Sequence, residues 1–184
     1  MSRQSFAASD VTDFPPASHT AVANTTTRTN LWVPALWTPI PALDPKPGKM
    51  YRLCAGGIIS TTGTPTIVFN PTFGQSATPA SNVALGATTT WTLGTLSSAP
   101  WYAEFTLGFR QLGIAASGAT CTGNGFVVVG GASGAVGQCV PMGGTVVTTA
   151  DHTTAQGMVF DVTWGAASAS NTITCQWSAL QSLN

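Results

Sequence analysis

Hydrophobic and polar residues alternate with a period of two in several short stretches of the chain beyond residue 49. The clearest stretch is 101–110, in which Trp101 and Phe105 point to one side while Tyr102 and Glu104 point to the other. This period is typical of a β-strand with one buried and one exposed face. Seven other stretches have the same alternation or a strand-like composition: 50–59, 64–73, 88–93, 126–129, 145–148, 158–164 and 172–179.

Turn-forming residues separate these stretches, and no window of the sequence combines helical periodicity with helix caps. Eight strands in a domain of about 135 residues predict an all-β fold. The predicted architecture is an eight-stranded jelly-roll-like β-sandwich, with an immunoglobulin-like sandwich as the alternative. In the last strand the alternation predicts that Ile173, Cys175, Trp177 and Ala179 share the buried side.

The first 47 residues differ from the rest because they contain seven of the twelve prolines. Proline fixes φ and removes a backbone donor, so this part is predicted to be an extended N-terminal arm, followed by a β-sandwich domain at 48–184. The arm either docks on a neighbouring subunit or covers its own domain. Its candidate partner-binding residues are the large apolar ones: Phe6, Phe14, Leu31, Trp32, Leu36 and Trp37.

Charged residues make up only 7% of the 184 residues, and the formal net charge is zero. Typical soluble domains have about 25% charged residues. A surface with so little charge offers little protection against self-association, so we expect copies of the chain to cover much of it in a homo-oligomer.

The same composition argues against several partners. Lys46, Lys49 and Arg52 form the only basic cluster, which is too small for binding nucleic acid or a membrane surface. No segment approaches 18 consecutive apolar residues, and the first residues lack the apolar stretch of a signal peptide, so we expect synthesis in a cytoplasm.

The four cysteines lack the Cys-x-x-Cys spacing of zinc sites. Cys54 and Cys175 lie in apolar strand patterns and are expected to be buried thiols. Cys121 and Cys139 flank a glycine-rich hairpin, and their pairing in a disulfide is left open by the sequence.

Three segments resemble small β-rich virion-associated proteins of tailed bacteriophages. They are 63–69 (Gly-Thr-Pro-Thr-Ile-Val-Phe), 100–105 (Pro-Trp-Tyr-Ala-Glu-Phe) and, most of all, 161–176 at the end of the chain. The resemblance covers roughly residues 50–184 and is one of strands and turns. It implies a capsid-decoration, head-fibre or minor structural role, usually as a trimer, with the major capsid protein or another virion protein as partner and the virion as location.

Groups that could catalyse a reaction are sparse. The chain has a single glutamate, Glu104, and two histidines, of which His152 lies in a predicted turn that begins at Asp151. The glycine-rich stretch 127–137 lacks the Gly-x-Gly-x-x-Gly order of a dinucleotide site. The five aspartates are scattered. We therefore expect no enzyme activity, no cofactor and no metal.

These observations favour a trimeric capsid-decoration or minor capsid protein that stabilises the shell. The alternative is a receptor- or glycan-binding module of a tail or head fibre, with Tyr102, Trp91 and Trp164 as candidate stacking residues. A major jelly-roll capsid protein is less favoured, because the arm is not basic. Glu104 and Arg110 are predicted on the outer face of their strand, in a cross-strand or solvated pair or in an intersubunit contact.

Overall fold

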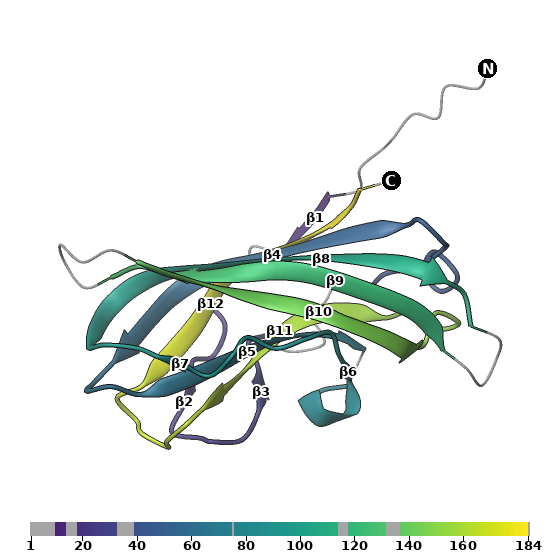
Figure 1. The fold of residues 1–184 in the computed structure, drawn as a ribbon. Coiled ribbons are helices and arrows are strands. Elements are labelled where there is room, and N and C mark those ends of the chain that lie inside the picture. Colours follow the sequence, from purple (N-terminus) through teal and green to yellow (C-terminus); the bar gives the residue numbers. More distant parts are fainter. Residues whose placement is uncertain are drawn as a thin grey trace.

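The computed structural model (Figure 1) describes residues 10–13, 18–32, 39–74, 76–113, 118–131 and 137–183. Two antiparallel sheets face each other, which confirms the predicted all-β sandwich. Among the described residues the helical structure is a single 3-10 turn at Pro79–Ser81. Figure 1 shows the larger sheet arching over the smaller one with its convex side outward.

The larger sheet has the strand order β1-β12-β4-β8-β9-β10, and β2 pairs with β12 as well. Its strands are β1 (Asp10–Asp13), β2 (Val22–Ala23), β4 (Met50–Thr61), β8 (Leu96–Gln111), β9 (Ala119–Val129), β10 (Gln138–Ala150) and β12 (Thr172–Ser182). The smaller sheet has the order β3-β11-β5-β6, and β7 also pairs with β5. Its strands are β3 (Thr29–Asn30), β5 (Thr66–Gly74), β6 (Val83–Ala84), β7 (Trp91–Thr92) and β11 (Gly157–Trp164).

The connections combine two patterns. The strand β12 returns to lie beside β4, the first long strand, as the last strand of a Greek key does. The pair β4–β12 in one sheet and the pair β5–β11 in the other form a ribbon folded across both sheets, which jelly rolls also have. In contrast, β8, β9 and β10 follow one another as a simple antiparallel meander.

The core lies between the two sheets and is aromatic. Phe69 of β5 packs against Trp101 of β8, and Phe73 packs against Phe109, each pair with ring centroids 5.7 Å apart. Along β8 the predicted alternation is confirmed, because every second residue from Trp101 to Phe109 is at most 3% exposed. β11 is buried on both of its faces, and Arg28 of the N-terminal segment lies against Asp161 on its outer face.

Two glycines close one side of the sandwich. The Gly143 amide of β10 donates to the carbonyl of Gly86, which follows β6, at 2.9 Å. A side chain at Gly86 would place its Cβ only 2.7 Å from Gly143 Cα, and both residues have positive φ (+115° and +104°). The glycines therefore allow the edge of the larger sheet to reach the smaller sheet.

The opposite side of the sandwich is covered by the N-terminal strap, which we define as residues 18–32. Its backbone bonds to both sheets: His19 donates to Cys175 of β12, and Leu31 donates to Phe160 of β11. The segment that the sequence predicts as an arm thus adds edge strands to its own domain, while the boundary at residue 47 stays a prediction.

A bulge in β12 corrects the predicted faces of that strand. The register with β4 shifts between Cys175 and Trp177. A one-residue shift moves every following side chain to the opposite face. Ile173 and Cys175 point inward as predicted, whereas Trp177 and Ala179 face outward, and Ser178 and Leu180 take the buried positions.

The cysteines differ from the expectation in one respect, and the structure answers the question that the sequence left open about Cys121 and Cys139. Cys54 faces outward and is half-buried, although Cys175 is fully buried as predicted. Cys121 pairs with Val147, and Cys139 pairs with Val128, seven residues further along β9. This separation is about 23 Å, too long for a disulfide within one chain, and none of the four cysteines forms a disulfide in the structure.

Candidate functional site on the outer face of the larger sheet

The outer face of the larger sheet carries an unusual group of side chains near the middle of its strands. We call it the outer-face cluster, and it consists of Arg52, Cys54, Tyr102, Glu104, Phe126 and Trp177. The residues come from four neighbouring strands, β12, β4, β8 and β9. All six are partly exposed, so they are open to a partner and still fixed by their neighbours.

Three aromatic rings cross this face in a row. The ring of Tyr102 lies 6.0 Å from Trp177, tilted by 35°, and 6.1 Å from Phe126, tilted by 49°. Gly56 of β4 lies between these two strands and is the cross-strand partner of both Tyr102 and Trp177. A Cβ at Gly56 would lie 2.8 Å from the indole nitrogen of Trp177, so the glycine makes room for the indole to lie over the sheet.

A small hydrogen-bonded group adjoins the rings. The Tyr102 hydroxyl donates to Glu104 Oε2 at 2.8 Å and lies 3.4 Å from the sulfur of Cys54. Arg52 Nε lies 3.6 Å from the other carboxylate oxygen, so the cross-strand ion partner of Glu104 is Arg52 of β4. Arg110, expected on the same face, is exposed where the pairing of β8 with β9 is irregular, between Phe109 and Gln111.

The electrostatics of the cluster do not activate its hydroxyl or thiol group as a nucleophile. Burial raises the pKa of the Tyr102 hydroxyl far above its usual range, and its hydrogen bonds to Cys54 and Glu104 act in the same direction. Burial also raises the pKa of the Cys54 thiol, opposed by the hydrogen bond from Tyr102. Both groups therefore stay protonated at neutral pH, and neither is an activated nucleophile.

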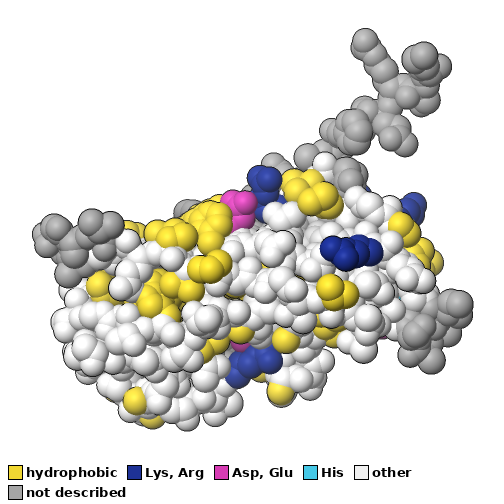
Figure 2. Space-filling model, in the orientation of Figure 1, with side chains coloured by type: hydrophobic (Ala, Val, Ile, Leu, Met, Phe, Trp, Pro, Cys, Tyr) yellow, Lys and Arg dark blue, Asp and Glu magenta, His cyan; other side chains and the backbone are white. Residues whose placement is uncertain are grey.

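The surroundings of the cluster are poor in charge. Figure 2 shows hydrophobic side chains gathered in patches over the arched sheet, with only a few basic and acidic side chains on the visible face. Two half-exposed apolar residues beside the rings enlarge the apolar area, namely Ile58 of β4 and Val128 of β9. This combination suits contact with another apolar surface.

Of the three residues that the sequence suggests for stacking on a glycan, the structure places two in the core and one on the surface. Trp91 and Trp164 are only 6% and 1% exposed and belong to the core, so they cannot stack on a ligand. Tyr102 lies on the surface as predicted. Trp177 was missed because the simple alternation predicts it inside; the neighbouring Gly56-Gly57 pair in β4 is the sequence signal of irregular packing there.

The predicted partner-binding residues of the arm lie partly in the described chain. Leu31 and Trp32 are 1% and 3% exposed, and Trp32 packs edge-on against Phe160 at 6.2 Å. Within one copy they therefore complete the core of their own domain. The other four lie outside the described residues: Phe6, Phe14, Leu36 and Trp37.

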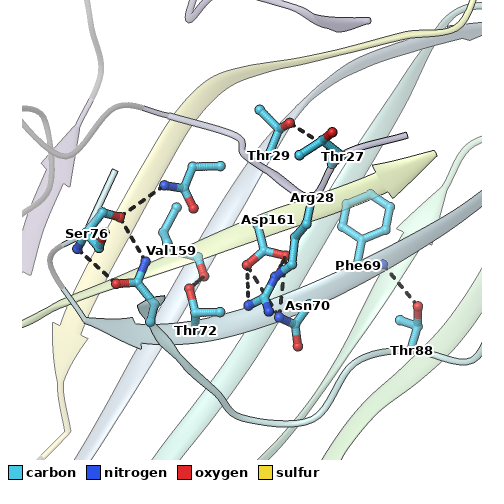
Figure 3. Close-up of polar contacts among 12 residues, drawn as sticks. Thr27, Arg28, Thr29, Phe69, Asn70, Thr72, Ser76, Thr88, Val159 and Asp161 are labelled. Carbon is cyan, nitrogen blue, oxygen red and sulfur yellow. Dashed lines mark hydrogen bonds and ion pairs between the residues drawn. The ribbon is translucent and has the colours of Figure 1, made fainter. Parts of the chain in front are cut away.

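A second polar group is buried beneath the strap (Figure 3). Arg28 forms a two-point ion pair with Asp161 of β11, with Nε 2.7 Å from Oδ1 and Nη2 2.8 Å from Oδ2. The amide nitrogen of Asn70 lies 3.4 Å from both carboxylate oxygens. Asp161 is fully buried, and this burial raises its pKa although Arg28 and Asn70 act in the opposite direction.

The predicted turn at Asp151 is confirmed. The Asp151 carboxylate accepts from the Thr153 amide and hydroxyl at 2.8 and 2.7 Å and from the Thr154 hydroxyl at 2.9 Å. These bonds, led by that from the Thr153 hydroxyl, lower the pKa of Asp151. The carboxylate is thus used to close the turn, and His152 beside it is buried.

Two kinds of site are absent from the part of the chain that the structure describes. No three histidine, cysteine, aspartate or glutamate side chains there come together as they would around a metal ion. No helix in those residues has the length and apolar character to cross a membrane.

Comparison with known proteins leaves the outer-face cluster as the main guide to function. No family model, no curated protein and no solved structure matches this chain.

Proposed function

We propose that the chain is a non-enzymatic structural protein of a bacteriophage virion, a trimeric capsid-decoration or minor capsid protein that binds the shell and stabilises it. The observation that carries the proposal is the outer-face cluster, a row of half-exposed rings on a sheet with almost no free charge. Such a surface gains free energy by contact with protein, at about 25 cal/mol per Å² of apolar area buried.

The size of the face is adequate for a stable contact. Five long strands, β12, β4, β8, β9 and β10, lie side by side in the larger sheet. With strands about 4.8 Å apart and about ten residues rising about 3.4 Å each, they outline roughly 800 Å². That is about what each partner contributes to a protein interface of standard size.

The sheet edges are less suited to assembly than this face. The long edge strand β10 contains Pro141 and has two register irregularities in its pairing with β9. Proline and bulges protect an edge against pairing with another chain. The other edges consist of strands of two to four residues. We therefore place the subunit contact on the face of the sheet.

The assignment to a virion is supported by the resemblance of residues 63–69, 100–105 and 161–176 to small proteins of tailed phages, and by the sparse charge of the chain. A decoration protein is present in many copies over the shell, whereas a receptor-binding protein is present at the tip of a fibre or tail. Electron microscopy of particles carrying the protein distinguishes the two locations.

The contact is tested with Phe126→Lys. Phe126 is half-exposed in β9, so a lysine there leaves the core intact but places an ammonium group in the proposed contact. We expect the variant to become monomeric in solution while keeping the wild-type circular dichroism spectrum, with mass measured by light scattering.

The matched control for this variant is Thr89→Lys, which adds the same charge at an exposed position between β6 and β7. This control is expected to keep the mass of the wild-type oligomer. A wild-type protein that is monomeric at all concentrations, or a Phe126→Lys variant with unchanged mass, contradicts the proposed contact.

The receptor- or glycan-binding alternative has one observation in its favour, which is the row of three rings. The rings are tilted against one another, however, and the Tyr102 hydroxyl is already bonded to Glu104. The face is also convex in Figure 1, whereas ligand sites are usually concave. Loss of binding to a glycan array in a Trp177→Ala variant would support this alternative.

A further inference from the structure

We propose that the strap, residues 18–32, is exchanged together with residues 39–42 between copies of this chain, so that the strap of one copy completes the sandwich of the next. The hinge is residues 43–48. The inference rests on the self-assembly proposed above and identifies which element passes from one copy to its neighbour.

The strap is attached to the body of the sandwich through an acceptor surface on the edges of two sheets. β2 pairs with β12 through Ala23 and Thr172, and β3 pairs with β11 through Asn30 and Asp161. The indole nitrogen of Trp164 donates to the carbonyl of Val22 at 3.3 Å. None of these contacts depends on the strap and the body belonging to the same copy.

The acceptor surface requires an arginine from its occupant. Asp161 is fully buried in the complete sandwich and is neutralised by Arg28, which comes from a position 133 residues earlier (Figure 3). A buried carboxylate without its cation strongly destabilises a protein. The strap can therefore leave its own body only if another strap takes its place. The strap of another copy has the residues that fit.

The hinge is strained in the form in which the strap folds back on its own body. Leu43 has φ +63°, a left-handed conformation that is unfavourable for a residue with a Cβ. It occupies a tight turn in which the Asp44 amide donates to Pro41 at 3.2 Å, and a second turn follows between Lys46 and Lys49. Strained hinge loops favour exchange, since opening the turns relieves the strain.

The same hinge has features of an extended connection. Pro45 and Pro47 favour extended backbone and disfavour helix in the residue before each. Leu43 is 63% exposed, more than the other large hydrophobic residues that are exposed in the described chain. An opened hinge that crosses to a neighbour would give this side chain an apolar surface to contact.

Cysteine trapping tests the exchange. Ala23 and Thr172 are direct cross-strand partners between β2 and β12, and both are partly exposed. Such partners have Cα atoms about 4.5–5.5 Å apart, within the range of disulfides. We would introduce Ala23→Cys and Thr172→Cys together into a Cys54→Ser, Cys139→Ser background, oxidise the assembled protein and analyse it on a denaturing gel without reductant.

If the strap is exchanged, the disulfide joins different copies, and most of the protein migrates as covalent oligomers. Reductant converts these oligomers to monomers on the gel. The control is Thr106→Cys with Asn124→Cys, partners between β8 and β9 in the body, whose disulfide must stay within one chain. An assembled protein whose 23–172 disulfide also stays within one chain overturns the exchange but leaves the proposed function intact. A protein that is monomeric before oxidation overturns both.

Discussion

At the scale of single residues, the buried pair of Arg28 and Asp161 is the least expected feature of a chain that has so few charges. Among the acidic residues whose side chains the structure describes, Asp161 lies fully inside and is paired with Arg28, one of only six basic residues in the chain. Burying a carboxylate is costly, and the raised pKa of Asp161 shows that the arginine compensates only in part. The pair therefore fixes the position of the strap more than it stabilises the fold.

Arg28→Met tests this interpretation. The variant leaves Asp161 buried without its cation, so we expect the free energy of unfolding at pH 7 to fall by about 3 kcal/mol. The carboxyl pKa in the folded state is already above its unfolded value and rises further in the variant. The penalty is therefore complete above the folded pKa and is lost as the pH falls through that pKa toward about 4, where the raised pKa keeps the carboxyl protonated in the folded state.

Urea unfolding at pH 7 and near pH 4 measures the effect of Arg28→Met, and Arg110→Met is the control because Arg110 is exposed. The difference between Arg28→Met and the wild type is expected to shrink at the lower pH. A difference that is equal at both pH values would show that the methionine acts through packing and not through the charge of Asp161.

The sequence predicted individual positions only where the local pattern was regular. The outward direction of Tyr102 and Glu104 follows from the alternation along β8. The pairing of Arg28 with Asp161 has no local signal, because 133 residues separate them. Trp177 was assigned to the wrong face because one bulge reverses the alternation, and a period-two pattern carries no information about where a bulge occurs.

At the scale of elements, the bulge in β12 is the irregularity that builds the outer-face cluster. Gly57 of β4 lies opposite Cys175, next to the bulge. A Cβ at Gly57 would lie 2.0 Å from the backbone oxygen of Thr174, which cannot move without disturbing the sheet. The close approach of the two backbones thus depends on glycine at this position.

We therefore expect Gly57→Ala to lower the free energy of unfolding by about 2–3 kcal/mol, since overpacking forces backbone shifts. Gly94→Ala is the matched control, because nothing lies within 4 Å of the Cβ that it adds. Its effect should stay within about 0.5 kcal/mol. Thermal or urea unfolding of the two variants gives the comparison, and equal stabilities would contradict the role assigned to Gly57.

The long strands β4, β5, β8, β11 and β12 were largely predicted, since their residues are rich in apolar and β-branched types with regular spacing. The predicted strands at 126–129 and 145–148 are far longer in the structure, where β9 begins at Ala119 and β10 at Gln138. The extensions contain glycines at 123, 125, 143 and 144, and glycine is uncommon in strands, so their sequence does not predict a strand. Pairing with neighbouring strands overrides local propensity there, as it often does in sheets.

At the scale of the whole molecule, the proposed assembly depends on apolar contact on a face that has few charged side chains. Arg52 and Glu104 pair within one copy, so these two charges do not have to be matched by a partner. Salt screens attraction between separate charges but not the burial of apolar surface. The mass of the oligomer is therefore expected to be the same in 50 mM and 1 M sodium chloride, as measured by light scattering. Dissociation at high salt would show that ionic contacts hold the copies together.

The first and last described strands lie side by side, with Asp10 opposite Gln181. A short peptide from residue 183 to residue 10, with new chain ends cut in the mostly exposed turn 165–170, would keep every neighbouring pair of strands. In such a circular permutant the strap would be joined to β12 at one end and to the hinge at the other, so it could pass to another copy only together with β12 and the pairing of β12 with β4. The permutant would thereby keep the ability to fold but hinder the sharing of the strap with the next copy, two properties that the natural order of the strands allows together.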